Sequence, residues 1–119
     1  MMLNEFINRV KSGQMVDFKD SMALIAEHYT YQPAEFSNGL QQPLVNQAGQ
    51  NEGSCKIFAF AMLQGLDQAQ TLALFGDYYR KDVLDSPDGT DHQNIRYFMR
   101  DGWQGITFKS EALTAKHAD

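Results

Sequence analysis

The chain has 119 residues, of which 43% are hydrophobic, 12% aromatic and 21% charged, and ten Lys and Arg against fifteen Asp and Glu give a net charge of −5. This length suits one domain, and the composition excludes intrinsic disorder, collagen-like repeats and coiled coils as the main state. The acidic balance argues against a nucleic-acid partner, because neutralising phosphates requires a basic surface. No stretch approaches the roughly 18 consecutive apolar residues of a membrane span, so we expect no membrane partner.

Two helices are predicted at the start of the chain. From Leu3 onward, apolar residues recur at i, i+3, i+4 and i+7, which predicts a helix over residues 2–12 that ends at Gly13. A second apolar stripe predicts a helix over residues 17–28, with Asp17 as its N-cap. We expect the two helices to form an antiparallel hairpin.

The stretch from Tyr29 to Gly53 has a different character. It begins with β-prone residues, contains Pro33, and carries turn signals around residues 39–43, so we expect one or two short strands here. Residues 46–53 are rich in amide side chains and glycine. They predict a loop with an unusual density of hydrogen-bonding groups.

An almost entirely apolar helix is predicted next, over Cys55–Leu63, with Ser54 as its N-cap and Gly65 at its end. A helix that is apolar on all sides belongs in the centre of a small domain. The least accessible residues are therefore expected to be Phe58, Phe60, Ala61 and either Met62 or Leu63.

Two further helices are predicted in the second half of the chain. One continuous helix is expected over residues 67–84, where an acidic variant of the capping box precedes an apolar stripe. A type I turn follows at 86–89. Thr90 or Asp91 is then expected to cap a fifth helix that ends at Gly102.

The end of the chain completes the predicted fold. Residues 105–108 alternate as a short strand, which we expect to pair with part of 29–37 or 44–46. The polar tail from about residue 114 is expected to be frayed. We therefore predict one compact α+β domain over residues 1–119, with about five helices and a small two- or three-stranded antiparallel sheet.

Cys55 is the first candidate for chemistry. The first turn of a helix lowers the pKa of a thiol, and amides (Gln50, Asn51) and a cation (Lys56) precede or follow this one in the sequence. Together with His92 as base, Cys55 would give a thiol-dependent hydrolase or acyltransferase. The alternative is that Cys55 is a small buried residue that opens a core helix.

A ligand site is the second candidate. The amide-rich loop ends at a helix N-terminus, where free N–H groups bind anions or carbonyl oxygens, and the start of the fifth helix would lie opposite it. In the alternative, the loop amides satisfy loop backbone and Arg96 makes an intramolecular bridge to an aspartate. The candidate ligand-binding residues are Asn46, Gln50, Asn51, Ser54, Lys56, Asn94 and Arg96, and the candidate catalytic residues are Cys55 and His92.

The aspartates between Asp82 and Asp91 recur every three residues, but they do not have the register of a calcium-binding loop. Turn and cap roles account for them. One cysteine and one usable histidine also fall short of a zinc site. We expect no metal and no cofactor. Tyr78, Tyr79 and Trp103 are assigned to packing, as is Tyr97.

Four segments carry a resemblance to a known family. They are NQAGQNEGSCKIFAFA (46–61), YYRKDVL (78–84), PDGTDHQNIR (87–96) and GWQGI (102–106). With them the chain, over about residues 2–113, resembles the HopJ type III effector protein family. The resemblance implies a small bacterial protein and leaves its biochemical activity open.

Three functional hypotheses follow. The first is a non-catalytic cytoplasmic binding or interaction module that uses the 46–56 loop and the 90–96 turn for a small ligand or a protein. The second is the thiol enzyme described above, and the third, implied by the resemblance, is an effector secreted through a type III system into a host cell. The N-terminus lacks the features of a secretory signal, so the cytoplasm is the expected compartment. A monomer is expected.

Overall fold

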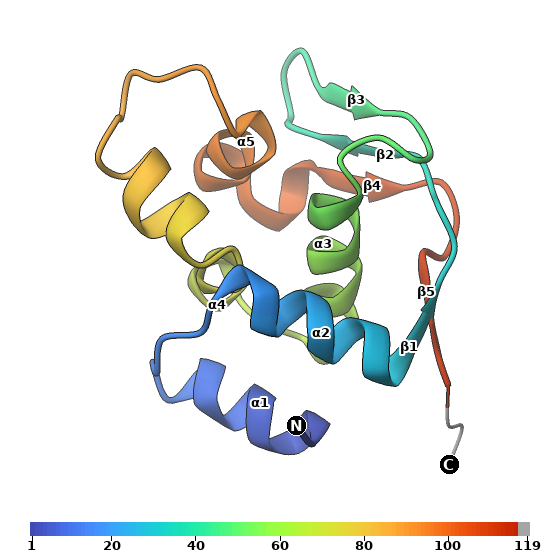
Figure 1. Cartoon of the computed structure of the whole chain (residues 1–119). Helices are drawn as coiled ribbons and strands as arrows, with labels where there is room; N and C mark the ends of the chain where they lie inside the picture. The colour runs from blue at the N-terminus through green and yellow to red at the C-terminus, as the bar shows by residue number, and fades with distance from the viewer. Residues whose placement is uncertain (117–119) are drawn as a thin grey trace.

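Figure 1 presents the computed structural model, which describes residues 1–116 of the chain. Runs of helices and runs of short strands follow one another in an α+β arrangement, as predicted. In chain order the elements are α1 (Leu3–Lys11), α2 (Phe18–His28), β1 (Tyr29–Tyr31), β2 (Phe36–Asn38), β3 (Leu44–Asn46), α3 (Glu52–Gln64), α4 (Gln68–Ala73), η1 (Tyr78–Val83), α5 (Gln93–Asp101), η2 (Gly102–Gly105), β4 (Ile106–Phe108) and β5 (Leu113–Ala115).

The strands form two small antiparallel sheets. The first has the order β3-β2-β4, so the predicted pairing of the strand near residue 106 with the 29–37 segment is confirmed. The second pairs β1 with β5, with Tyr29 opposite Ala115. The prediction of a frayed tail from residue 114 is therefore wrong for residues 114 and 115, because their backbone pairs with β1. Residues 117–119 of that predicted tail lie outside the described part of the chain.

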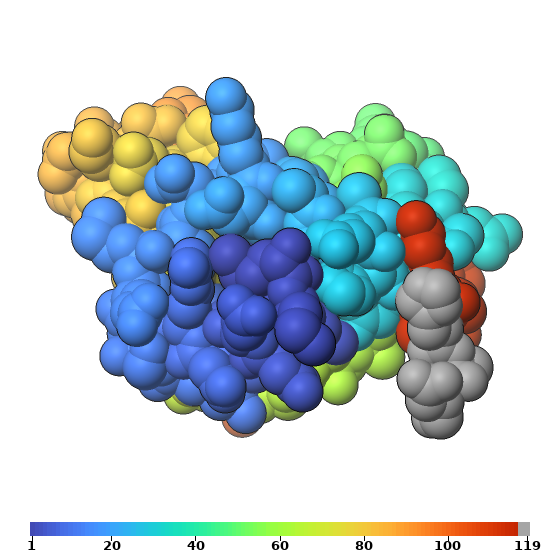
Figure 2. Space-filling model, turned by 60° about the horizontal axis from the view of Figure 1, so that its bottom comes forward, coloured from blue at the N-terminus to red at the C-terminus, as the bar shows by residue number. Residues whose placement is uncertain are grey.

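Helices α1 and α2 form the predicted antiparallel hairpin (Figure 1). Asp17 begins α2, and its backbone N–H donates to the Asp20 carboxylate at 3.1 Å. Gly13 follows α1 with φ +84°, a conformation that glycine adopts at little cost. In Figure 2 the two helices cover much of one face, and the end of β5 lies beside the β1 region.

Helix α3 is the centre of the core. Phe58, Phe60 and Ala61 are fully buried, as predicted. The prediction for Met62 or Leu63 is wrong, since these side chains are 48% and 58% exposed. They share a helix face with Ala59 at i+3 and i+4, and this face lines a shallow groove beside β4 and β5 instead of the core.

The ring of Phe58 is the meeting point of the aromatic core. It lies 4.9 Å from the ring of Phe98 and 5.6 Å from that of Phe75, measured between centroids. It also contacts Phe36 and Trp103. These rings come from β2, η2, α5 and the segment after α4. The Phe58 side chain therefore packs α3 against four other parts of the fold.

The predicted continuous helix over 67–84 is divided in two. Gly76 has φ +62°, and a Cβ on it would lie 2.6 Å from the backbone nitrogen of Phe18. The chain therefore turns at Gly76, close against the start of α2, and resumes as the π-helical segment η1. In the described part of the chain no helix is both long and apolar enough to cross a membrane.

Candidate functional site

A concave pocket of about 490 Å³ opens where α2, α3, η1 and α5 meet the edge of β3. Its size is that of a small-molecule site. Both the amide-rich loop and the start of α5 contribute to it, as predicted. The pocket is lined by Phe18, Leu44, Asn51, Gly53, Ser54, Phe75, Tyr78, His92, Gln93, Asn94 and Ile95.

Helix α3 begins at the pocket, three residues earlier than a Ser54 cap would allow. Its N-cap is Asn51, which has φ +51°, and the first helical bond runs from the Cys55 N–H to the Asn51 carbonyl at 3.0 Å. Ser54 is thus inside the first turn. Within residues 1–116, the N–H groups of Gly53 and Ser54 donate to no protein atom, as is usual for a first turn.

Helix α5 also begins at the pocket. Its N-cap is His92, with φ +49°, and neither Thr90 nor Asp91, so that prediction is wrong. The first bond runs from the Ile95 N–H to the His92 carbonyl at 3.0 Å. In the described chain the N–H groups of Gln93 and Asn94 likewise have no protein acceptor, and both residues line the pocket.

Four asparagines hold these two helix starts against the sheet. The buried Asn46 Oδ1 accepts from Asn51 Nδ2 at 2.7 Å and from Asn94 Nδ2 at 2.9 Å. Asn94 Oδ1 in turn accepts from Asn38 Nδ2 at 3.1 Å and from Asn46 Nδ2 at 3.2 Å. Asn46 is therefore a support beneath the pocket, whereas Asn51 and Asn94 are both support and lining.

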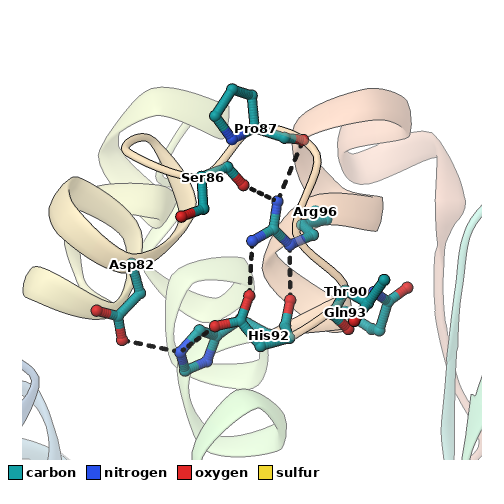
Figure 3. Close-up of polar contacts among 8 residues, drawn as sticks. Asp82, Ser86, Pro87, Thr90, His92, Gln93 and Arg96 are labelled. Atoms are coloured by element: carbon teal, nitrogen blue, oxygen red, sulfur yellow. Dashed lines mark hydrogen bonds and ion pairs between the residues drawn. The ribbon is translucent and has the colours of Figure 1, made fainter.

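His92 forms one wall of the pocket with η1. Its Nε2 lies 3.0 Å from Asp82 Oδ2 (Figure 3). The centroid of its ring lies 5.1 Å from that of the Tyr78 ring. Asp91 Oδ2 is farther from Nε2, at 3.8 Å. No group of three or more His, Cys, Asp or Glu among residues 1–116 is arranged to hold a metal.

Arg96 does not line the pocket, although it was a candidate ligand-binding residue. Its guanidinium donates to the Asp91 carboxylate at 2.6 Å and to the carbonyl of Ser86 at 2.8 Å (Figure 3). The hydrogen bond from Arg96 holds the pKa of the Asp91 carboxyl below its usual range. The intramolecular bridge is thus what the structure contains, and it closes the 86–91 turn onto α5.

Cys55 and Lys56 lie on another side of α3. Cys55 is 1% exposed, its Sγ–H donates to the Ala34 carbonyl at 3.7 Å, and burial raises its pKa. Lys56 Nζ lies 4.7 Å from the centroid of the Tyr31 ring. Neither residue lines the pocket that contains His92, so the structure does not bring Cys55 and His92 together there.

The remaining candidate, Gln50, is exposed and closes its own turn: its Oε1 accepts from the Gln47 N–H at 3.1 Å. The loop-backbone role considered for these amides therefore holds for Gln50.

Sequence reasoning missed the aromatic wall. The rings of Phe18 and Tyr78 lie 5.0 Å apart, edge to face, and both line the pocket. Tyr78 was assigned to packing, but it is 43% exposed. Both aromatic residues have the helical spacing of apolar residues in the sequence. This spacing does not distinguish a ring buried in the core from a ring that lines a pocket. A Cβ at Gly53 would lie 2.7 Å from the Phe18 ring, so glycine keeps this wall close to α3.

Comparisons with known proteins agree with the resemblance seen in the sequence. The family model described as HopJ type III effector protein matches residues 3–113. A crystal structure described as that of the unknown function protein VPA0580 is 49% identical, with a TM-score of 0.93 over 98% of this chain and 95% of that chain. No match was found among curated proteins.

Proposed function

We propose that this chain, which belongs to the HopJ type III effector protein family, binds a small ligand without transforming it. The ligand would lie in the pocket between the starts of α3 and α5. The ligand carries one carboxylate or phosphate group and an apolar, ring-like part. This deepens the expectation of a binding module that uses the 46–56 loop and the 90–96 turn.

The observation that carries the proposal is the convergence of two helix starts on one pocket. Backbone N–H groups of Gly53, Ser54, Gln93 and Asn94 belong to lining residues and have no protein acceptor in the described chain. Each helix start also carries partial positive charge from the helix dipole. A ligand oxygen with negative charge would satisfy these donors.

The charges around the pocket limit how many negative charges the ligand can carry. The protein has a net charge of −5, and the carboxylates of Asp82 and Asp91 flank His92. The electrostatic field of these groups would repel a polyanion. A single anionic group is still favoured, because in a partly enclosed site its short-range attraction to the nearby N–H donors exceeds the repulsion from more distant carboxylates.

The apolar part of the ligand has a place on the other walls. Leu44, Phe75 and Ile95 contribute apolar surface, and the ring of Tyr78 stands beside that of Phe18. Aromatic side chains favour edge-to-face or offset contacts with a further ring. A flat ring with one acidic group therefore matches both kinds of lining.

Ser54→Asp tests the proposal. Asp at this position of the first turn is favourable for the helix dipole, so α3 should remain folded, while its carboxylate competes with the ligand anion. Binding of phenylacetate and of phenyl phosphate is measured by isothermal titration. The matched control is Asn8→Asp, which makes the same charge change at an exposed position of α1, a helix that contributes no residue to the pocket lining.

We expect at least one probe to bind the native chain and the Asn8→Asp variant equally, and to bind Ser54→Asp at least ten-fold more weakly, roughly the effect of 1.4 kcal/mol. Equal binding to both variants would place the probe elsewhere. Absence of binding of both probes to the native chain would contradict the proposed ligand class.

We also propose that the protein acts in the bacterial cytoplasm. Its single cysteine is free and buried, so the fold needs no oxidising compartment. Secretion into a host, as in the name of the family, is the alternative. Cell fractionation and analysis of culture supernatants under conditions that induce type III secretion distinguish the two.

A further inference from the structure

We propose that His92 recognises a hydrogen-bond donor of the ligand through Nδ1, so that the ligand is a hydroxy acid: an anionic group for the helix starts and a hydroxyl for the imidazole. This inference rests on the proposed function, because it names the chemistry of the ligand in the same pocket. It is carried by the contact between His92 and Asp82, which is independent of the two helix starts.

The contact with Asp82 fixes the proton on one ring nitrogen. An ionised carboxylate accepts hydrogen bonds and cannot donate them. With Nε2 at 3.0 Å from Asp82 Oδ2, and with the Asp91 carboxylate 3.8 Å away on the same nitrogen, Nε2 must carry the proton. In the neutral ring Nδ1 then has a lone pair and is an acceptor.

The ring is held in place on its other faces. Tyr78 lies against it at 5.1 Å with an interplanar angle of 33°, and the backbone of His92 is committed to capping α5. The side chain is only 28% exposed. Among the hydrogen bonds of residues 1–116, the His92 ring takes part through Nε2 only, and His92 lines the pocket, so Nδ1 is the ring nitrogen that is left for a ligand.

This makes the two sides of the pocket complementary in hydrogen bonding. The starts of α3 and α5 offer donors, whereas His92 offers an acceptor. A ligand with only an anionic group uses one side. A ligand with a hydroxyl near its anionic group uses both, and its ring can still meet the Tyr78 and Phe18 wall.

The role of Asp82 is tested first, without any ligand. Nitrogen-15 NMR of the histidine rings at alkaline pH, with His92 assigned from a His92→Asn variant, reports which nitrogen carries the proton. We expect His92 to be almost wholly in the Nε2–H form in the native chain and in Asp85→Ala, and to become a mixture in Asp82→Ala. An Nδ1–H form in the native chain would overturn the inference.

The ligand class is tested with a matched pair of probes. Mandelate differs from phenylacetate by one hydroxyl, beside the carboxylate. By isothermal titration we expect the better enantiomer of mandelate to bind about five-fold more tightly, the effect of one net hydrogen bond. The advantage should persist in Asp85→Ala and fall below about two-fold in Asp82→Ala.

The two proposals fail in different ways. If phenylacetate and mandelate bind equally to the native chain, with both weakened by Ser54→Asp, the proposed function stands and the inference about His92 is wrong. If phenyl phosphate binds and neither acid does, the proposed function stands and the inference about His92 is wrong. If none of the three probes binds the native chain, the proposed ligand class is wrong and the inference falls with it.

Discussion

The residues of the first turn of α3 are adjacent in the sequence, but the two sides of this turn have different surroundings. Gly53 and Ser54 face an open pocket, whereas Cys55 is buried against Ala34 and Lys56 lies over Tyr31. Successive residues of a helix are about 100° apart around its axis. Neighbours that look like one site in the sequence are therefore divided by the helix, and the proposed binding pocket lies on the side that meets α5.

The largest expected effect concerns the core that both sides share. Phe58→Ala should lower the free energy of unfolding by about 3–5 kcal/mol, because it removes a fully buried ring at the centre of an aromatic cluster. Urea denaturation measures the loss. The control is Leu63→Ala on the exposed face of the same helix, for which we expect no more than about 0.5 kcal/mol. Similar losses in the two variants would mean that α3 is not central.

The support beneath the pocket should give the next largest effect. Asn94→Ala removes three side-chain hydrogen bonds of the buried network, the two that Asn94 Oδ1 accepts and the one that Asn94 Nδ2 donates, so we expect a loss of about 2–3 kcal/mol. Gln50→Ala, which removes an amide from the exposed part of the same loop, should cost less than about 0.5 kcal/mol. The comparison is made by urea denaturation, and equal costs would show that the network is not buried.

The other side of α3 is tested through the thiol. Burial raises the pKa of Cys55 in the folded chain, so its contribution to stability is complete below the unfolded-state pKa and is lost as the pH rises through the folded-state value. The urea midpoint of the native chain should fall more steeply above pH 8 than that of Cys55→Ala. Alkylation of Cys55 should require unfolding. Fast alkylation of the native protein would contradict the burial of Cys55 and support the hypothesis of a thiol-dependent enzyme.

The smallest expected effect lies at the turn before α5. The hydrogen bond from Arg96 lowers the pKa of Asp91, so the stability it contributes is present above the unfolded-state pKa and is lost as the pH falls through the folded-state pKa. Acid unfolding of Asp91→Asn should therefore begin at a higher pH than that of the native chain. Asp88→Asn, in the same turn, is the control and should leave the acid transition unchanged.

Much of the fold follows from periodicity in the sequence. The two N-terminal helices, the apolar α3 and the strand near residue 106 all have the spacing of their structure, because their burial is set by local pattern. Gly76 and β5 escaped prediction for a different reason. Gly76 turns the chain because it must pass close to Phe18, and β5 exists because β1 lies beside it. Both depend on partners that are distant in sequence.

The candidate site could be predicted only in outline. The loop and the 90–96 turn were expected to meet, and they do, but the direction of each side chain depends on where each helix begins. Both N-caps, Asn51 and His92, have left-handed backbone, which sequence patterns do not indicate for these residues. The α3 N-cap lies three residues before Ser54, and Cys55 lies against Ala34 instead of lining the pocket with His92.

One measurement tests the division of α3 most directly. Backbone amide chemical shifts are recorded by NMR while phenylacetate is titrated into the native chain. We predict that the largest shifts occur at Gly53, Ser54 and Gln93, and that the amides of Ala34 and Lys56 stay where they are. Shifts that centre on Ala34 and Lys56, with the pocket residues unchanged, would contradict the account.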